Sequence, residues 1–183
     1  GSITNNTSVV TAGNLTLTAT ASGAAIGATG AGADINVTAS GTLTATASTG
    51  AGGIFITETG AMSIVTVNAG AAGNVELEST STITDTAGDD TTVDITGALL
   101  TIRTSTGIGV TAANALNLSV ANLVITATTG NAFITEANGI GLGTVNVAGN
   151  SLTLEAITGS ITNNTSVVTA GNLTLTATAS GAA

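Results

Sequence analysis

The first 25 residues of the chain return, letter for letter, as its last 25. Residues 1–25 and residues 159–183 both read GSITNNTSVVTAGNLTLTATASGAA, which gives a period of 158 residues (159 − 1). Repeat architectures accommodate such a period by stacking similar units along one axis. We therefore expect residues 1–183 to be a single continuous segment of a longer tandem array. In this interpretation residues 1–158 are one full repeat, and residues 159–183 begin the next.

A weaker period lies inside the first. When the two halves of the repeat are aligned, Phe55 falls on Phe133 and Glu58 falls on Glu136, at one common offset (133 − 55 = 136 − 58). The short motif TVN at 66–68 recurs at 144–146, which is the same offset again. The repeat therefore divides into two diverged halves that average about 79 positions each (158/2).

Short runs of alternating apolar and polar residues fill both halves. Examples are NLTLTAT (14–20), NVELE (74–78) and TVDIT (92–96), and turns rich in Gly, Asn and Asp separate such runs. Period-two alternation of β-forming residues is typical of strands with one buried face, and no helical period is evident. Strands start about every ten residues, so two strands with their turns predict a coil of about 20 residues.

These patterns predict an all-β fold, a right-handed parallel β-helix (β-solenoid). With about 20 residues per coil, each half holds four coils (79/4 is close to 20) and the 158-residue repeat holds eight. Eight coils advance about 38 Å at the usual strand spacing, and parallel crossovers are almost always right-handed. The alternative is a β-sandwich, but its hairpins and large aromatic side chains do not explain a seamless repeat.

Composition excludes several functional classes. The net charge is −9 and Arg103 is the single Lys or Arg, so the chain lacks the cations that a nucleic-acid-binding surface requires. The chain also has no His, Cys, Lys or Tyr, which removes the usual catalytic bases and nucleophiles. No apolar run approaches the ~18 residues of a membrane-spanning helix. We therefore expect no catalytic residue, no cofactor, no nucleic-acid partner and no membrane insertion.

Glu76 and Glu78 form the carboxylate pair that comes closest to a catalytic pattern. They alternate along one expected strand, so both should point outward, roughly 7 Å apart. That separation suits an inverting glycosidase. However, the other half carries Thr153 in place of Glu76, and we expect no Arg or Lys near the pair to hold an acidic sugar. We therefore interpret the two glutamates as charges that keep a strand face soluble.

Four aspartates gather in one expected turn region and are a weak candidate calcium site. Carboxylate oxygens are the ligands that Ca²⁺ prefers. The spacing matches neither an EF-hand nor a calcium-roll repeat, and Asp also closes turns without any metal. The four residues are Asp85, Asp89, Asp90 and Asp94.

Phe55 and Phe133, at equivalent positions of the two halves, are the only aromatic residues. If Ile54 and Ile56 face the core, strand alternation turns Phe55 outward. An outward ring repeated along the axis is a candidate lateral contact between neighbouring rods. The alternative is that each Phe fills a corner of the core.

Three stretches resemble a known family. GNLTLTATASGAAIG, GIFITETGAMSIVTVNAGAAGNVELEST and TGIGVTAANALNLSV are similar to repeats of the filamentous-haemagglutinin-like exoproteins and related β-strand-repeat adhesins of bacteria. The resemblance covers nearly the whole chain. It implies a right-handed β-helix, export to the cell surface, and a role in adhesion, spacing or filament building. It implies no catalytic residues.

The leading functional hypothesis is a structural repeat segment of an extracellular bacterial rod or filament. Its partner would be the protein itself, through end-to-end continuation of the solenoid and lateral bundling. The alternative is an adhesin module whose solenoid face binds a glycan, or the surface of a host or neighbouring cell. A polysaccharide-cleaving β-helix enzyme is the third hypothesis, which a groove holding three or more carboxylates would favour.

Overall fold

The computed structural model describes residues 1–5, 7–30, 32–47, 50–86, 92–127, 129–163 and 165–178. These residues form strands and turns, with no helix. The strands are β1 (Val9–Ala12), β2 (Leu15–Ala19), β3 (Ile35–Ala39), β4 (Thr42–Ala47), β5 (Ile54–Glu58), β6 (Met62–Asn68), β7 (Val75–Ser79), β8 (Ile83–Asp85), β9 (Ile95–Thr104), β10 (Leu116–Ala127), β11 (Ala132–Glu136), β12 (Ile140–Ala156), β13 (Ile161–Asn163) and β14 (Val168–Ala177).

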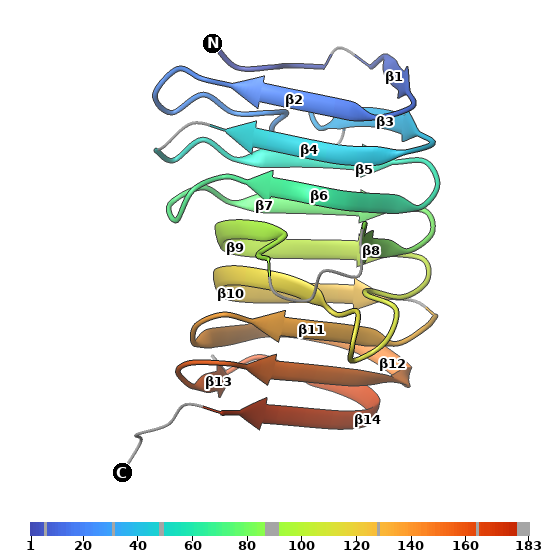
Figure 1. The fold of residues 1–183 in the computed structure, drawn as a ribbon, viewed down its shortest axis with the longest axis vertical. Helices are drawn as coiled ribbons and strands as arrows, with labels where there is room; N and C mark the ends of the chain where they lie inside the picture. Colours follow the sequence, from blue (N-terminus) through green and yellow to red (C-terminus); the bar gives the residue numbers. More distant parts are fainter. Residues whose placement is uncertain are drawn as a thin grey trace.

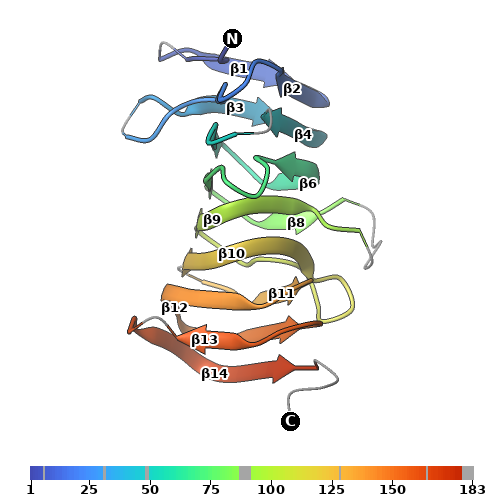
Figure 2. The same cartoon turned by 90° about the vertical axis from the view of Figure 1, so that its left-hand side faces the viewer.

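The strands stack into a parallel β-solenoid. Every pairing between the named strands is parallel, and each joins strands that lie about one coil apart in the sequence. Figures 1 and 2 show the coils as layers of one column, with the two chain ends at opposite ends of it. The prediction of a parallel solenoid is confirmed. A β-sandwich is wrong, because its hairpins would pair neighbouring strands antiparallel.

The number of coils, in contrast, is lower than predicted. Leu15 and Leu173 are equivalent residues of the two sequence copies (173 − 158 = 15). Seven parallel pairings connect their strands, namely β2–β4, β4–β6, β6–β8, Ile83–Ile108, Ile108–Ala132, β11–β12 and β12–β14. The repeat therefore holds seven coils, each averaging about 23 positions (158/7). The prediction of eight shorter coils is wrong.

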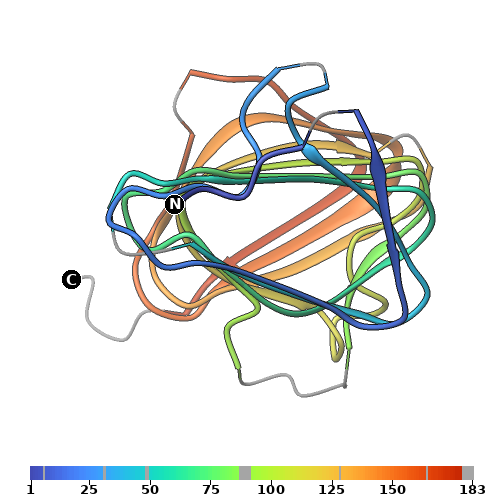
Figure 3. The same cartoon turned by 90° about the horizontal axis from the view of Figure 1, so that it is seen from above.

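The coils differ in length because their turns differ. Paired residues are 18 positions apart for Leu116 and Ile134 (134 − 116) but 28 apart for Leu15 and Leu43 (43 − 15). Figure 3, seen along the axis, shows some turns following a common outline and others projecting beyond it. A projecting turn adds residues without adding a layer, so dividing the repeat by an average strand spacing overestimates the number of coils.

Aliphatic side chains fill the interior in columns along the axis. The strand alternation points Val, Leu and Ile inward in each coil, and parallel pairing places each of them on its neighbour. One such column contains six paired residues that are at most 2% exposed, namely Ile26, Ile54, Val75, Leu100, Leu123 and Leu142. Burial of each such side chain stabilises the fold by about 1.5–3 kcal/mol.

The two end coils leave apolar side chains uncovered. At the first coil Val10, whose pairing partner Val37 is 1% exposed, is itself 39% exposed, and at the last coil Leu173 is 49% exposed. One coil inside the last, Leu152, which pairs with Leu173, is 1% exposed. The difference arises because β14 pairs with β12 on one side, while no strand of the described residues covers its other edge.

Candidate functional site

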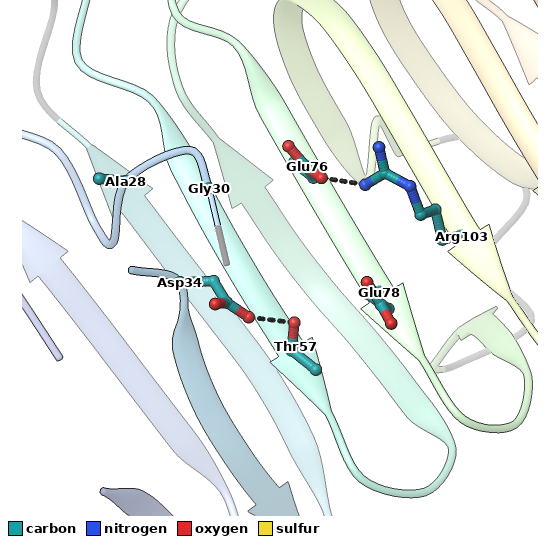
Figure 4. A pocket seen from close by; sticks show the side chains of 7 residues that line it. All are labelled: Ala28, Gly30, Asp34, Thr57, Glu76, Glu78 and Arg103. Carbon is teal, nitrogen blue, oxygen red and sulfur yellow. Dashed lines mark hydrogen bonds and ion pairs between the residues drawn. The ribbon is translucent and has the colours of Figure 1, made fainter. Parts of the chain in front are cut away.

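A charged groove lies on the outer face of the solenoid near its N-terminal end. Its volume is about 390 Å³, and Figure 4 shows the side chains that line it. The floor comes from β5, β7 and β9, and the turn that precedes β3 forms one wall. The lining residues are Ala28, Gly30, Asp34, Thr57, Glu76, Glu78 and Arg103.

Parallel register assembles this groove from three coils. Thr57 pairs with Glu78 and Glu78 pairs with Arg103, so these three residues form a column on one face. Glu76 lies two residues before Glu78 on β7 and therefore points to the same side. Asp34 joins them because it ends the turn immediately before β3.

Two polar contacts organise the groove. Arg103 Nη1 forms an ion pair with Glu76 Oε1, and Thr57 Oγ1 donates a hydrogen bond to Asp34 Oδ2 (Figure 4). The side chains of Arg103 and Glu76 are 48% and 33% exposed, so their attraction is screened by water. The expectation that no Arg lies near Glu76 is wrong. The two residues are 27 positions apart in sequence, and only the stacking of coils brings them together.

The groove has an excess of negative charge. Three carboxylates (Asp34, Glu76 and Glu78) and one guanidinium give a net charge of −2 (−3 + 1). The Glu78 side chain is exposed and has no ion pair or hydrogen bond among the described residues. Some glycosidases enclose their general acid in apolar side chains. Neither Glu76 nor Glu78 is enclosed in this way. The groove therefore presents carboxylate oxygens that can accept hydrogen bonds from hydroxyl or amino groups.

The second half of the repeat lacks this charge arrangement. Phe55 pairs with Glu76, whereas its equivalent Phe133 pairs with Thr153. In the same way Glu78 pairs with Arg103, whereas Glu155 pairs with Thr176. Since the second half stacks in parallel coils without these charges, they are not needed to build the solenoid.

Glu58 and Glu136 are buried, which the sequence analysis did not predict. There they were used only as matching positions of the two halves. Glu58 is 2% and Glu136 is 0% exposed. The Glu58 carboxylate accepts the Ala39 N–H at 3.0 Å, and the Glu136 carboxylate accepts the Val120 N–H at 3.1 Å. Strand alternation could have identified them. Every second residue of a strand faces the same side, so Glu58 faces inward with Ile54 and Ile56. Glu136 faces inward with Ala132 and Ile134 for the same reason.

Burial raises the pKa of both carboxyls. Loss of water penalises the charged form, and the backbone hydrogen bonds that Glu58 and Glu136 accept offset only part of that penalty. The pKa of Glu58 is raised from its ordinary value, and the pKa of Glu136 is raised to about 7. The Glu136 carboxyl therefore changes charge near neutral pH, where an exposed glutamate is already ionised.

The chain matches no protein-family model, and no curated protein or solved structure is similar to it. The resemblance to filamentous-haemagglutinin-like exoproteins accordingly stays a prediction. Within the described residues no helix has the length and apolarity needed to cross a membrane.

The structure describes two of the four aspartates of the candidate calcium site, Asp85 and Asp94. Asp94 is 3% exposed, and its Oδ2 accepts the backbone N–H of Asn117 at 2.8 Å, which ties it to the next coil. Asp85 Oδ2 is buried and has no hydrogen-bond partner within the described part of the chain. Asp89 and Asp90 lie outside the described residues, so the calcium site stays a prediction.

Both phenylalanines lie on the outer face. Ile54 and Ile56 are 0% and 1% exposed, which turns Phe55 outward, and both rings are half-buried there. Phe55 lies over Gly53, where an added Cβ would meet the ring at 2.4 Å. The alternative that the rings fill core corners is therefore wrong. A lateral contact between rods through Phe55 and Phe133 stays a prediction.

Proposed function

We propose that this chain is a structural repeat segment of an extracellular bacterial rod or filament, in which one solenoid continues from repeat to repeat. The supporting observation is the relation between β2 and β14. β2 and the last five residues of β14 both read LTLTA, lie seven coils apart in one stack, and run in the same direction (Figure 1). The repeat therefore ends on a coil from which the next repeat can proceed without a break.

The interior provides the stiffness that such a rod requires. Parallel backbone ladders run the length of the described column, and aliphatic side chains fill most of its interior. One inward column contains the buried polar residues Glu58, Ser79 and Thr104, which pair with one another. Bending the rod would separate coils on one side, which opens both the hydrogen bonds and the apolar contacts. The extracellular bacterial setting comes from the family resemblance described above.

Tandem chains of one, two and three repeats test this function. Each added repeat should lengthen the particle by about 34 Å, seven coils at the ~4.8 Å strand spacing. Electron microscopy and small-angle X-ray scattering measure that increment. A two-repeat chain with a flexible Gly/Ser linker at the repeat boundary is the matched control and should show two short rods with a hinge. Separate globular particles in the uninterrupted chain would contradict the proposal.

A second candidate function is glycan binding, as in an adhesin. The charged groove supports it, because exposed carboxylates accept hydrogen bonds from sugar hydroxyls and attract amino groups. The net charge of −2 favours an amino sugar over an acidic one. Titration calorimetry with deacetylated chito-oligosaccharides tests this, with cello-oligosaccharides as the neutral comparison.

Glu78→Gln should weaken such binding at least tenfold. Glu155→Gln is the matched control, since Glu155 occupies the equivalent position in the half without the charged groove. Equal affinity in both variants would reject the groove as the binding site. Polysaccharide cleavage, the third candidate, gains support from the three carboxylates of the groove. Release of reducing ends in the same samples would identify it.

A further inference from the structure

We infer that Phe55 is a stacking surface for a sugar ring, in an uncharged hollow that adjoins the charged groove. One amino-sugar oligosaccharide then occupies both, with a sugar ring on Phe55 and its amino groups at the carboxylates. The inference rests on glycan binding, the second candidate function, and adds to it the residue that holds the apolar face of the ligand.

The uncharged hollow has a volume of about 330 Å³. It lies along the segments that lead into β3, β5 and β7, so three coils contribute to it. Its lining consists of Gly and Ala residues together with Thr29, Asn74 and Phe55. Phe55 is the largest side chain of this lining, and its half-buried ring keeps part of its surface open to the hollow.

A glycine provides the seat on which the ring rests. A Cβ added at Gly53 would lie 2.4 Å from the Phe55 ring atom Cε2 and 2.5 Å from Cζ. The tip of the ring therefore occupies the space that a side chain at position 53 would need. A ring that is already held by its own chain loses little further conformational freedom when a ligand binds, which favours binding.

The hollow and the charged groove are neighbours. Phe55 pairs with Glu76 of the next strand, at the ~4.8 Å strand spacing, and Ala28 lines both cavities. A sugar ring has an apolar C–H face and polar edges, so it can stack on an aromatic ring while its hydroxyl and amino groups reach carboxylates. The groove's net charge of −2 complements protonated amino groups, which selects an amino sugar.

The hollow lies within the stack of coils. Ile3 of the first coil pairs with Ile26, and the Gly27 N–H donates a hydrogen bond to the Ile3 carbonyl at 2.9 Å. Residues of the first coil therefore pair with the segment that leads into β3. The hollow accordingly does not depend on a free strand edge.

The second half of the repeat lacks both features around Phe133. Asn131 stands where the first half has Gly53 (131 − 53 = 133 − 55), and its Oδ1 accepts the Ser151 N–H at 2.9 Å. Phe133 also pairs with Thr153 and not with a glutamate. Since the second half stacks in parallel coils without them, the glycine seat and the adjacent carboxylate are not needed to build the solenoid.

Saturation-transfer NMR tests the ring directly, because Phe55 and Phe133 are the only aromatic residues of the chain. The protein is produced deuterated with protonated Phe, and the probe is a β-1,4-linked glucosamine tetrasaccharide. Saturation of the Phe protons should pass to the C–H protons of the sugar. The transfer should persist in Phe133→Leu, in which Phe55 is the only ring, and should vanish in Phe55→Leu.

Titration calorimetry with the same tetrasaccharide measures what the ring contributes. Phe55→Leu should weaken binding about tenfold, whereas Phe55→Tyr, which keeps an aromatic ring, should bind as the unchanged chain does. Phe133→Leu is the matched control and should also bind unchanged. Circular dichroism checks that each variant keeps its β structure. The transfer measured in Phe133→Leu involves no change at Phe55, so the test holds even if Phe55→Leu fails to fold.

The outcomes separate the ring from the groove and from the rod. Binding without transfer from Phe55, or equal weakening in Phe55→Leu and Phe133→Leu, would overturn the stacking assignment, while Glu78→Gln would still decide the groove. A tetrasaccharide that does not bind at all would reject both the ring and the groove as glycan sites. The tandem-chain experiment decides the rod independently.

Discussion

The carboxylate of Glu136 accepts a hydrogen bond from the backbone N–H of Val120, which lies one coil earlier, at 3.1 Å. The same contact exists in the other half between Glu58 and the N–H of Ala39, at 3.0 Å. In both cases the donor lies two residues beyond the glutamate's own pairing partner. Each half of the repeat therefore uses one buried carboxylate to join two coils where a strand ends or bends.

Because of the buried glutamates, we predict that the fold is more stable at mildly acidic pH than at mildly alkaline pH. The folded-state pKa of Glu136 is raised from 4.5 to about 7, so between these values the folded chain binds more protons than the unfolded chain. The associated stability is fully present below pH 4.5 and is lost as pH rises through 7. Urea denaturation at pH 5 and pH 8 should show a difference on the order of 2 kcal/mol. Glu136→Gln should remove most of it, whereas Glu155→Gln on the outer face should not.

Truncation of the core column should destabilise the chain strongly. Leu100 is 0% exposed and pairs with Val75 on one side and Leu123 on the other. Leu100→Ala leaves a cavity that neighbouring coils cannot fill without breaking their ladders, so we expect a loss of about 2–5 kcal/mol. Val65→Ala is the control, because Val65 is 44% exposed. Equal denaturation midpoints for the two variants would contradict the column as described.

Two glycines with different surroundings provide a matched pair. A Cβ at Gly73 would lie 2.3 Å from the carbonyl oxygens of both Ala69 and Gly52, so Gly73→Ala must displace backbone. A Cβ at Gly13 would meet nothing within 4 Å. We expect Gly73→Ala to cost more than about 2 kcal/mol, and Gly13→Ala to be neutral or stabilising by up to ~1 kcal/mol. Thermal denaturation of both variants measures the difference.

Arg103 makes trypsin a probe of global unfolding. It is the single Lys or Arg in the chain, and its backbone lies in β9, paired with β7 on one side and β10 on the other. Although its side chain is 48% exposed, cleavage requires the strand to leave the sheet. The folded chain should resist trypsin, and the unfolded chain should give two fragments on a gel. Rapid cleavage without denaturant would show that β9 opens locally.

The same residue should contribute little to stability. The ion pair between Arg103 and Glu76 is exposed to water, and such pairs contribute about 0–1 kcal/mol. Arg103→Gln should therefore change the free energy of unfolding by less than about 1 kcal/mol. A change several times larger would mean that the groove supports the fold, which would weaken its case as a binding site.

Alternation along single strands determined what the sequence could predict. Residues with the parity of Ile54 and Ile56 point inward, and this identifies the core, the outward Phe55 and, by the same parity, the buried Glu58. Contacts between coils were not accessible in the same way, because they depend on the length of each turn. Arg103 reaches Glu76 only because the chain between β7 and β9, which includes β8, has the length that pairs Arg103 with Glu78.

The unequal coil lengths affect how the length of the solenoid along its axis depends on the number of residues. Paired residues are separated by 18 to 28 positions, yet each coil occupies one layer of the same stack. The axial length of the solenoid therefore depends on the number of layers and not on the number of amino acids. Insertions or deletions in the projecting turns would alter the outline of the solenoid while leaving its length along the axis unchanged. The axial length of the solenoid and the side surface formed by its turns can thus change independently of each other.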